Sequence, residues 1–221
     1  MGMSEILSKG PARFRQLVAN ENFRRITRRK GDYIVRQEHE ITEVYWSEAA
    51  QFMLLHTALN GKTLSLGDYF LEDNFFGEIE FFSGKPCSFD VVATATTELV
   101  VIPKERFAEI LLQDAATSFW MNHRMANMYQ SSMNIAIERS LYPLKFNIVK
   151  DIVSRCTSET RALNHDYMYQ EAQRFGCTDR AYTRIIHELI KEGLVKKGED
   201  NSTIVPINMD GLVAYLEQYQ Q

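Results

Sequence analysis

The stretch from Met168 to Gly193 constrains the fold of this chain more than any other. It reads MYQEAQRFGCTDRAYTRIIHELIKEG, in which Ala172 stands four residues before Gly176. A small residue lets two helices approach closely, and a glycine permits a positive φ at the turn between them. Thr178 then suits the N-cap of a second helix. This pattern predicts a helix-turn-helix.

The predicted second helix has two faces. Apolar residues recur at i, i+3, i+4 and i+7 and indicate a buried face made of Tyr182, Ile185, Ile186 and Leu189. The opposite face carries side chains suited to the base edges and phosphates of DNA. The candidate DNA-binding residues are Thr178, Asp179, Arg180, Thr183, Arg184, His187 and Lys191. The alternative is an ordinary amphipathic helix with a solvated polar face.

A hairpin is predicted directly after this helix. Two short apolar runs, Leu194-Val195 and Ile204-Val205, flank a polar turn. A helix-turn-helix followed by a hairpin is a winged helix. Lys196 and Lys197 either reach DNA phosphates from the wing or are solvated surface charge, and both interpretations stay open.

Length and composition favour a soluble protein of two domains. No run of eighteen apolar residues predicts a membrane span, and no apolar N-terminal region predicts a signal peptide. Three scattered cysteines, Cys87, Cys156 and Cys177, give no metal-site spacing and favour a reducing cytoplasm. We therefore expect a cytoplasmic protein with no membrane partner, no metal site and no certain cofactor.

Charge is unevenly distributed along the chain. The net charge is −4, yet residues 1–30 hold eight Lys/Arg and two Asp/Glu. A helix is predicted over residues 4–23, and most of these cations follow it. They could contact DNA or a partner, but a charged surface leading into the first strand is the favoured interpretation. Residues 144–221 hold ten Lys/Arg and eleven Asp/Glu, so DNA binding would depend on where the cations lie.

From Gly31 to Ile102 the pattern becomes one of short strands. Apolar or β-branched runs alternate with Gly, Asn and Asp turns, and Asn60-Gly61 between two such runs is a strong hairpin signal. Many short strands at close spacing predict an antiparallel barrel or jelly roll. The predicted class is α+β, with a β-roll and flanking helices over residues 1–112, a long helix over 113–142 and the winged helix over 143–221.

One segment of the predicted roll carries a resemblance. Gly67-Asp68, then Phe76-Gly77-Glu78 and a loop to Ser88, resemble the phosphate-binding cassette of cyclic-nucleotide-binding domains. With the helix-turn-helix downstream, nearly the whole chain resembles the cyclic-AMP receptor protein/FNR family of transcription regulators. The turn glycines common in that family are replaced by Glu38 and Ala50, which indicates a divergent roll.

The resemblance implies an effector pocket in this cassette. Gly77 and Glu78 match the positions that bind the ribose side of a nucleotide, and Ser88 matches a phosphate-binding hydroxyl. The arginine position falls on Cys87, which cannot supply bidentate donors, so cyclic AMP is not the expected effector. For Glu78, ligand binding and pairing with backbone donors in a turn both stay open. Cys87 is a redox-sensitive thiol, a ligand contact or a buried inert thiol, and the last is favoured because a reactive thiol needs an electropositive, partly exposed setting.

A long helix is predicted from Ala115 to Leu141, with an apolar stripe that includes Met121, Met125, Met128 and Ile135. The resemblance implies that this helix pairs with its twin and touches the effector, which adds Met125 and Met128 to the candidate pocket. Packing against the roll is the alternative. Leu141–Pro143 is the predicted hinge.

These features together predict a homodimeric, sequence-specific DNA-binding regulator of transcription, controlled by a small-molecule effector. Its expected partners are double-stranded DNA with a near-palindromic operator and, by resemblance, RNA polymerase. No catalytic cluster or nucleotide loop indicates an enzyme. The alternative function is a ligand-sensing or protein-partner module whose helix-turn-helix is vestigial.

Overall fold

The computed structural model describes residues 3–157, 168–198 and 203–219. The chain divides into two compact units, which are described separately. The first comprises Met1–Leu54 and Tyr69–Asn134, and the second comprises Leu55–Asp68 and Ile135–Gln221. In the part of the chain that the structure describes, no helix combines the length and apolar character needed to span a membrane.

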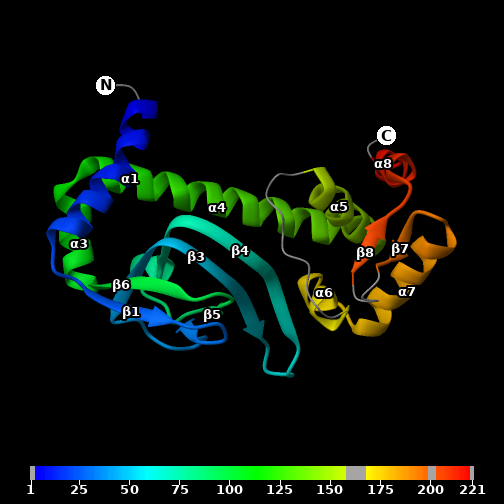
Figure 1. Ribbon diagram of the computed structural model, residues 1–221, viewed down its shortest axis with the longest axis horizontal. Helices are drawn as coiled ribbons and strands as arrows, with labels where there is room; N and C mark the ends of the chain where they lie inside the picture. Colours follow the sequence, from blue (N-terminus) through cyan, green and yellow to red (C-terminus); the bar gives the residue numbers. More distant parts are fainter. Residues whose placement is uncertain (1–2, 158–167, 199–202, 220–221) are drawn as a thin grey trace. The chain divides into compact units, whose positions relative to one another are not determined.

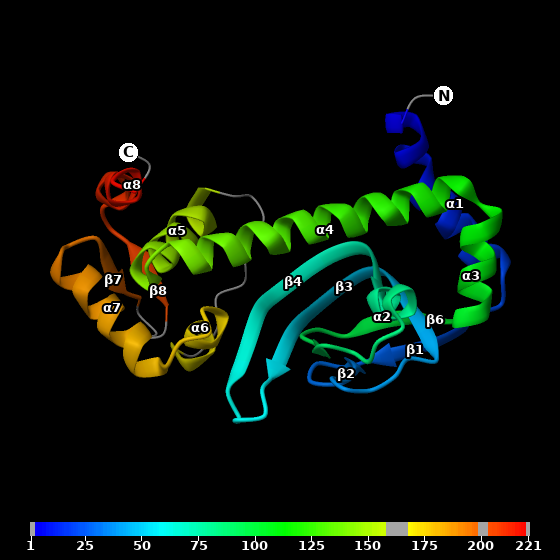
Figure 2. The same ribbon diagram turned by 180° about the vertical axis from the view of Figure 1, so that it is seen from behind.

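The first unit is a curled sheet with helices packed against it (Figures 1 and 2). Its elements, of which β3, β4 and α4 extend into the second unit, are α1 (Met3–Asn20), β1 (Arg24–Arg28), β2 (Tyr33–Val35), β3 (Glu43–Thr57), β4 (Thr63–Phe76), α2 (Glu78–Ser83), β5 (Asp90–Ala93), β6 (Thr97–Pro103), α3 (Lys104–Gln113) and α4 (Ala115–Leu141).

The strands form one sheet in the order β1-β6-β3-β5-β2, with β4 paired to β3. Strands β1 and β6, β3 and β6, and β2 and β5 pair antiparallel. The predicted Asn-Gly hairpin joins β3 to β4: Gly61 has a φ of 78°, and its N–H donates to Ala58 O at 2.8 Å. The predicted β-roll is confirmed.

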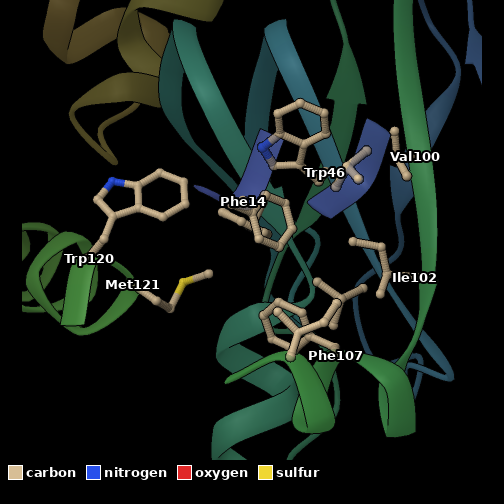
Figure 3. Packing of buried hydrophobic residues seen from close by; sticks show 11 residues of the cluster. Phe14, Trp46, Val100, Ile102, Phe107, Trp120 and Met121 are labelled. Atoms are coloured by element: carbon tan, nitrogen blue, oxygen red, sulfur yellow. The ribbon is translucent and has the colours of Figure 1, made fainter. Parts of the chain in front are cut away.

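An aromatic core fills the space between the sheet and the helices (Figure 3). Phe14 of α1 is fully buried and lies edge-on to Trp46 of β3 at 5.6 Å between ring centroids. Phe75 meets both Phe14 and Trp120 of α4 at 4.9 and 5.6 Å. Such pairs contribute about 0.5–1.5 kcal/mol each beyond the area they bury, so α1 and the start of α4 are held firmly on the roll.

This core takes up the beginning of the apolar stripe predicted for dimerisation. Met121 is 1% exposed and packs among the aromatic side chains (Figure 3), and Met125 packs partly against the same cluster. Met128 and Ile135 are exposed. The core alternative is therefore correct for Met121, and only the later part of the stripe is free to meet a partner.

The arginines that follow α1 lie within a strand. Residues 24–28 form β1 rather than a lead-in to the first strand, because they pair with β6 in a regular register. Arg24 pairs with Glu43 at 2.9 Å, and Arg25 pairs with Glu98 at 2.6 Å. The favoured interpretation of a charged surface holds for these two side chains.

The second unit is a winged helix. Its elements are α5 (Leu144–Thr157), α6 (Met168–Arg174), α7 (Asp179–Lys191), β7 (Val195–Lys197), β8 (Ile204–Pro206) and α8 (Met209–Glu217). Its core joins Ala172 of α6 to the apolar face of α7 and to Val195 of the wing. Residues 199–202 of the predicted wing turn lie outside the described residues, but the antiparallel pairing of β7 with β8 confirms the hairpin.

The ends of these helices follow the sequence closely. Gly176 turns between α6 and α7 with a φ of 61°, and Gly193 follows the C-cap of α7 with a φ of 69°. The last helix begins at Met209, one residue earlier than Asp210, because the Asn208 side chain accepts from Gly211 N at 2.9 Å and provides the N-cap.

Candidate nucleic-acid interface and effector cassette

Helix α7 presents a polar face anchored by a buried apolar one. Tyr182, Ile185, Ile186 and Leu189 are each at most 4% exposed. On the other side, Arg180, Arg184 and His187 are exposed. One shallow hollow on α7 is lined by the candidate residues Asp179, Arg180, Thr183, Arg184, His187 and Lys191, together with Glu188. The structure therefore brings the predicted contact residues of this helix together on one surface.

The two arginines keep their guanidiniums in solvent. Arg184 is 73% exposed at its side chain and has only a distant ion pair with Glu188, 3.9 Å from Nε to Oε1. Among the described residues no ion pair is found for Arg180. Glu188 is not among the residues predicted for this surface from the sequence, although it follows Arg184 at i+4 and so lies on the same helical face. Together with Asp179 it lowers the positive charge of this surface.

Thr178 has a structural role. It lies at the N-cap of α7, where its hydroxyl accepts from Ala181 N at 3.2 Å. That bond satisfies one of the N–H groups that a helix start leaves without a partner. In the wing, Val195 is buried while Lys196 and Lys197 are exposed, so both lysines are accessible to a phosphate or to solvent.

A ring of four charged side chains joins α6 to α5. Glu171 is 4% exposed, and its carboxylate accepts from Arg155 of α5 and from Arg174, the latter at 2.9 Å. Asp151 of α5 accepts two further bonds from Arg174, at 3.1 and 2.7 Å. Glu171 occupies a place that is usually apolar in this motif, and the structure explains the departure: two guanidiniums neutralise the buried carboxylate.

The cassette begins at Gly77. This residue precedes α2 with a φ of 88°, and a Cβ added there would lie 3.3 Å from Glu43 O. Both the left-handed conformation and the close approach favour glycine. At the position of a replaced turn glycine, Glu38 keeps a positive φ of 63°, and its N–H donates to Cys87 O at 2.8 Å. The turn that braces the cassette thus survives without its glycine.

Cys87 lies inside the roll. It is 2% exposed and packs in a cluster with Ile34, Val35 and Phe76. Burial raises the pKa of its thiol to about 11, with the Glu80 carboxylate adding to the effect. This placement agrees with the inert-thiol interpretation, and it means that Cys87 offers neither charge nor strong donor to a ligand.

Glu78 of α2 and Arg124 of α4 lie close enough for their charges to influence each other. Glu78, in the first turn of α2, keeps partial exposure, but burial of its carboxyl raises its pKa to about 7. Arg124 of α4 opposes that shift through its charge, while burial lowers the pKa of its own guanidinium. Arg124 is fixed by a 3.0 Å bond from Nη2 to Asn74 Oδ1.

Arg124 is the functional candidate that sequence reasoning missed. Its nearest sequence signal was its position next to Met125, on the stretch of α4 expected to touch the effector. Ser88, in contrast, is an exposed residue at the end of the cassette loop. The structure thus places a cation of the long helix near Glu78, while a buried thiol occupies the arginine position of the cassette.

Comparison with known proteins agrees with this architecture. Residues 25–114 match the cyclic nucleotide-binding domain family. A search of curated proteins found no match. Among solved structures, the chain is similar to the c-di-GMP-responsive global regulator CLP of Xanthomonas campestris, with 15% identity, 88% of this chain and 98% of that chain covered, and a TM-score of 0.74.

Two further structures show the same fold. A transcriptional regulator of the crp/fnr family from Eubacterium rectale is 18% identical, with 91% and 93% of the two chains covered and a TM-score of 0.71. FixK2 from Bradyrhizobium japonicum is 14% identical, with 88% and 97% covered and a TM-score of 0.65. The chain therefore has the fold of these solved regulators, and residues 25–114 match the cyclic nucleotide-binding domain family.

Proposed function

We propose that this protein is a homodimeric, sequence-specific DNA-binding regulator of transcription. The observation that carries the proposal is the polar face of α7, where Arg180, Arg184 and His187 project into solvent from a helix whose other face is buried. A helix of this kind, second in a helix-turn-helix, fits the major groove of DNA. RNA polymerase is a predicted partner on the resemblance alone.

Base recognition is assigned to the two arginines. An arginine can donate two bonds to the O6 and N7 atoms of guanine, and each such contact is worth about 1–3 kcal/mol of discrimination. The side-chain exposure of Arg184 leaves its donors available. Thr183 and His187 flank it on the same face and suit phosphate or base contacts.

Dimerisation is assigned to the later part of α4. Residues 126–137 are exposed on every side of this helix, and the exposed side chains include Met128, Tyr129, Met133, Ile135 and Ile137. A long helix segment with this much apolar surface is stable when another helix covers part of it. Two copies related by a twofold axis would present two α7 helices to a near-palindromic operator.

The effector is assigned to the cassette, with Arg124 as its cation. One of the similar structures, the regulator CLP, is described as responsive to c-di-GMP, an anionic nucleotide, and this supports an anionic effector here. In this chain Gly77 and Glu78 are retained while the cassette arginine is replaced by a buried thiol. We therefore propose a small anionic effector other than cyclic AMP. Thermal unfolding with cyclic AMP, c-di-GMP or small carboxylates tests this, because a ligand of the folded state raises the melting temperature.

The experiment for DNA binding starts from the unmodified protein. Selection from random duplex DNA should enrich a near-palindromic sequence, and its affinity should fall steeply with salt. Arg184→Ala should then weaken specific binding by roughly 1–3 kcal/mol and relax the preference at one base position. Lys104→Ala, which removes an exposed cation from α3, is the matched control and should leave specific binding unchanged.

Two results would overturn the proposal. No enriched sequence, together with salt-independent binding, would favour the alternative of a ligand-sensing module with a vestigial motif, for which the acidic Asp179 and Glu188 on α7 are the best argument. Unchanged specific binding by Arg184→Ala would show that α7 does not read the groove through this side chain.

A further inference from the structure

The last two turns of α4 are fastened to the winged helix. Glu138 of α4 pairs with Lys150 of α5 through Oε1 and Nζ. The adjacent Arg139 donates from Nη2 to the backbone carbonyl of Arg174, at the end of α6, at 2.6 Å. Two neighbouring residues of opposite charge thus hold two different helices of the same compact unit.

The carbonyl that Arg139 reaches is one that needs a donor. The last carbonyls of a helix have no partner within it, and Arg174 is the final residue of α6. A cation at this end is also favoured by the helix dipole. The side chain of the same Arg174 is fixed in the buried charge ring with Glu171 and Asp151. Arg139 therefore bonds α6 at Arg174, a residue whose own side chain is fixed by Glu171 and Asp151.

The predicted hinge at Leu141–Pro143 is braced rather than free. The Asn147 side chain donates to Tyr142 O at 3.1 Å and to Pro143 O at 3.2 Å. Tyr142 N donates to Glu138 O at 2.9 Å, and the Tyr142 ring stacks on Phe146 with 4.2 Å between centroids. In line with this bracing, the compact unit that contains the winged helix also includes the end of α4 from Ile135 onward, together with Leu55–Asp68.

We infer that Glu138 and Arg139 are positioning residues that make the end of α4 part of the DNA-binding unit, so that any regulatory movement pivots in α4 before Ile135 and not at Pro143. The inference rests on the proposed function. If it holds, the two residues fix the angle between each α7 and the helix that joins the two copies. That angle determines which spacing between half-sites a dimer accepts.

The test measures spacing rather than affinity alone. The operator selected by the unmodified protein is compared with versions that have one base pair inserted or removed between the half-sites. We expect the unmodified protein to discriminate strongly among them. Glu138→Lys and Lys150→Glu should each reduce this discrimination by at least about threefold, the scale of an exposed ion pair. The double variant Glu138→Lys/Lys150→Glu restores the pair and should restore the discrimination.

Arg139 is tested by a graded pair of variants. Arg139→Gln removes the cation and should broaden the accepted spacing, whereas Arg139→Lys keeps a cationic donor and should retain most of the preference. Arg106→Gln, which breaks the ion pair of Arg106 in α3 with Glu21, the residue after α1, is the control and should leave spacing unaffected. Melting temperatures of all variants are measured in parallel, because a merely structural role would change stability and not spacing.

The outcomes separate the inference from the proposed function. If the unmodified protein selects no operator, the proposed function fails. An operator can be found while the single variants keep its spacing preference, or while the charge-swapped double variant does not recover that preference. In either case the positioning role of Glu138 and Arg139 is wrong, and DNA binding stands.

Discussion

The effector cassette and the helix-turn-helix contain the same three kinds of residue in different environments. Each has an inward-facing glutamate near arginine and a cysteine close by. In the helix-turn-helix, Glu171 accepts bonds from two guanidiniums. In the cassette, Glu78 has the charge of one arginine within range, and burial still raises its carboxyl pKa to about 7.

The difference shows how to distinguish a structural carboxylate from a binding one. A buried ion is tolerated when opposite charges and hydrogen bonds fully compensate it. The ring around Glu171 comes close to that condition, because two guanidiniums bond its carboxylate, and it holds α5 and α6 together. Glu78 and Arg124 are incompletely compensated, and titratable groups in that condition gather at binding sites.

Breaking the ring around Glu171 should have the largest effect. Glu171→Ala leaves the half-buried Arg155 and Arg174 with only Asp151 to oppose them, and removing the buried partner of such a network costs about 3–5 kcal/mol. Urea unfolding followed by far-ultraviolet circular dichroism should show that loss. Both tryptophans, Trp46 and Trp120, lie in the first unit, so fluorescence reports on that unit alone and should change little.

The matched control for this variant is Glu98→Ala. Glu98 pairs with Arg25 on the surface of the first unit, and an exposed pair contributes about 0–1 kcal/mol. Equal losses for the two variants would show that the ring is not a buried structural element. If Glu171→Ala does not fold, Glu171→Gln keeps the side-chain shape and tests the missing charge on its own.

Glu78 should make the first unit less stable as the pH rises. Its pKa is about 7 in the folded protein against an ordinary 4.5, so between these values the folded state binds more protons than the unfolded state. The free energy of unfolding therefore falls as pH rises from about 4.5 to about 7. Glu78→Gln removes this contribution and should be more stable than the unmodified protein by about 1–2 kcal/mol at pH 8, after allowance for the partial exposure of Glu78.

Tryptophan fluorescence in urea at pH 5 and pH 8 measures this effect, with Glu98→Gln as the exposed control. Arg124→Gln supplies a second comparison. Because the Arg124 charge opposes the pKa rise of Glu78, its removal should steepen the loss of stability with pH. Parallel pH profiles for Glu78→Gln and the unmodified protein would mean that Glu78 is compensated as fully as Glu171.

Sequence reasoning succeeded where the determining interactions are local. The buried face of α7, the turn at Gly176 and the hairpin at Asn60-Gly61 depend on residues within a few positions of one another. The cation in the cassette was missed because Arg124 comes from α4, far along the chain from Glu78. Only the folded structure brings them within range.

The same limit applies to two individual residues. The reason for a glutamate at position 171 is not visible in the sequence, because its partner Arg155 lies sixteen residues earlier, on α5. Met121 counted as part of the dimer stripe because periodicity does not reveal which element covers a helix face, and the aromatic core covers it. For both residues the sequence indicates the helix correctly but does not show which distant side chains pack against it.

The smallest expected effect is a difference in alkylation rate between the cysteine of the cassette and those of the winged helix. Cys87 of the cassette is buried with a pKa raised to about 11, Cys177 of the helix-turn-helix is half-buried with a raised pKa, and Cys156 is exposed. Iodoacetamide at pH 8 should modify Cys156 first, Cys177 next and Cys87 last. Because a pKa of about 11 leaves less of the thiol ionised at pH 8, the alkylation rate of Cys87 should be about a hundredfold lower than that of an ordinary thiol.

Peptide mass spectrometry over time gives the three rates, and the same reaction in urea is the control in which they should converge. Reaction of Cys87 at a rate near that of Cys156 would mean that the cassette opens and exposes a nucleophilic thiol. In that case the cysteine would regain a role in ligand or redox chemistry. Slow modification of Cys87, with rapid modification of Cys156 on the same molecules, would leave the long helix as the source of the cassette's positive charge.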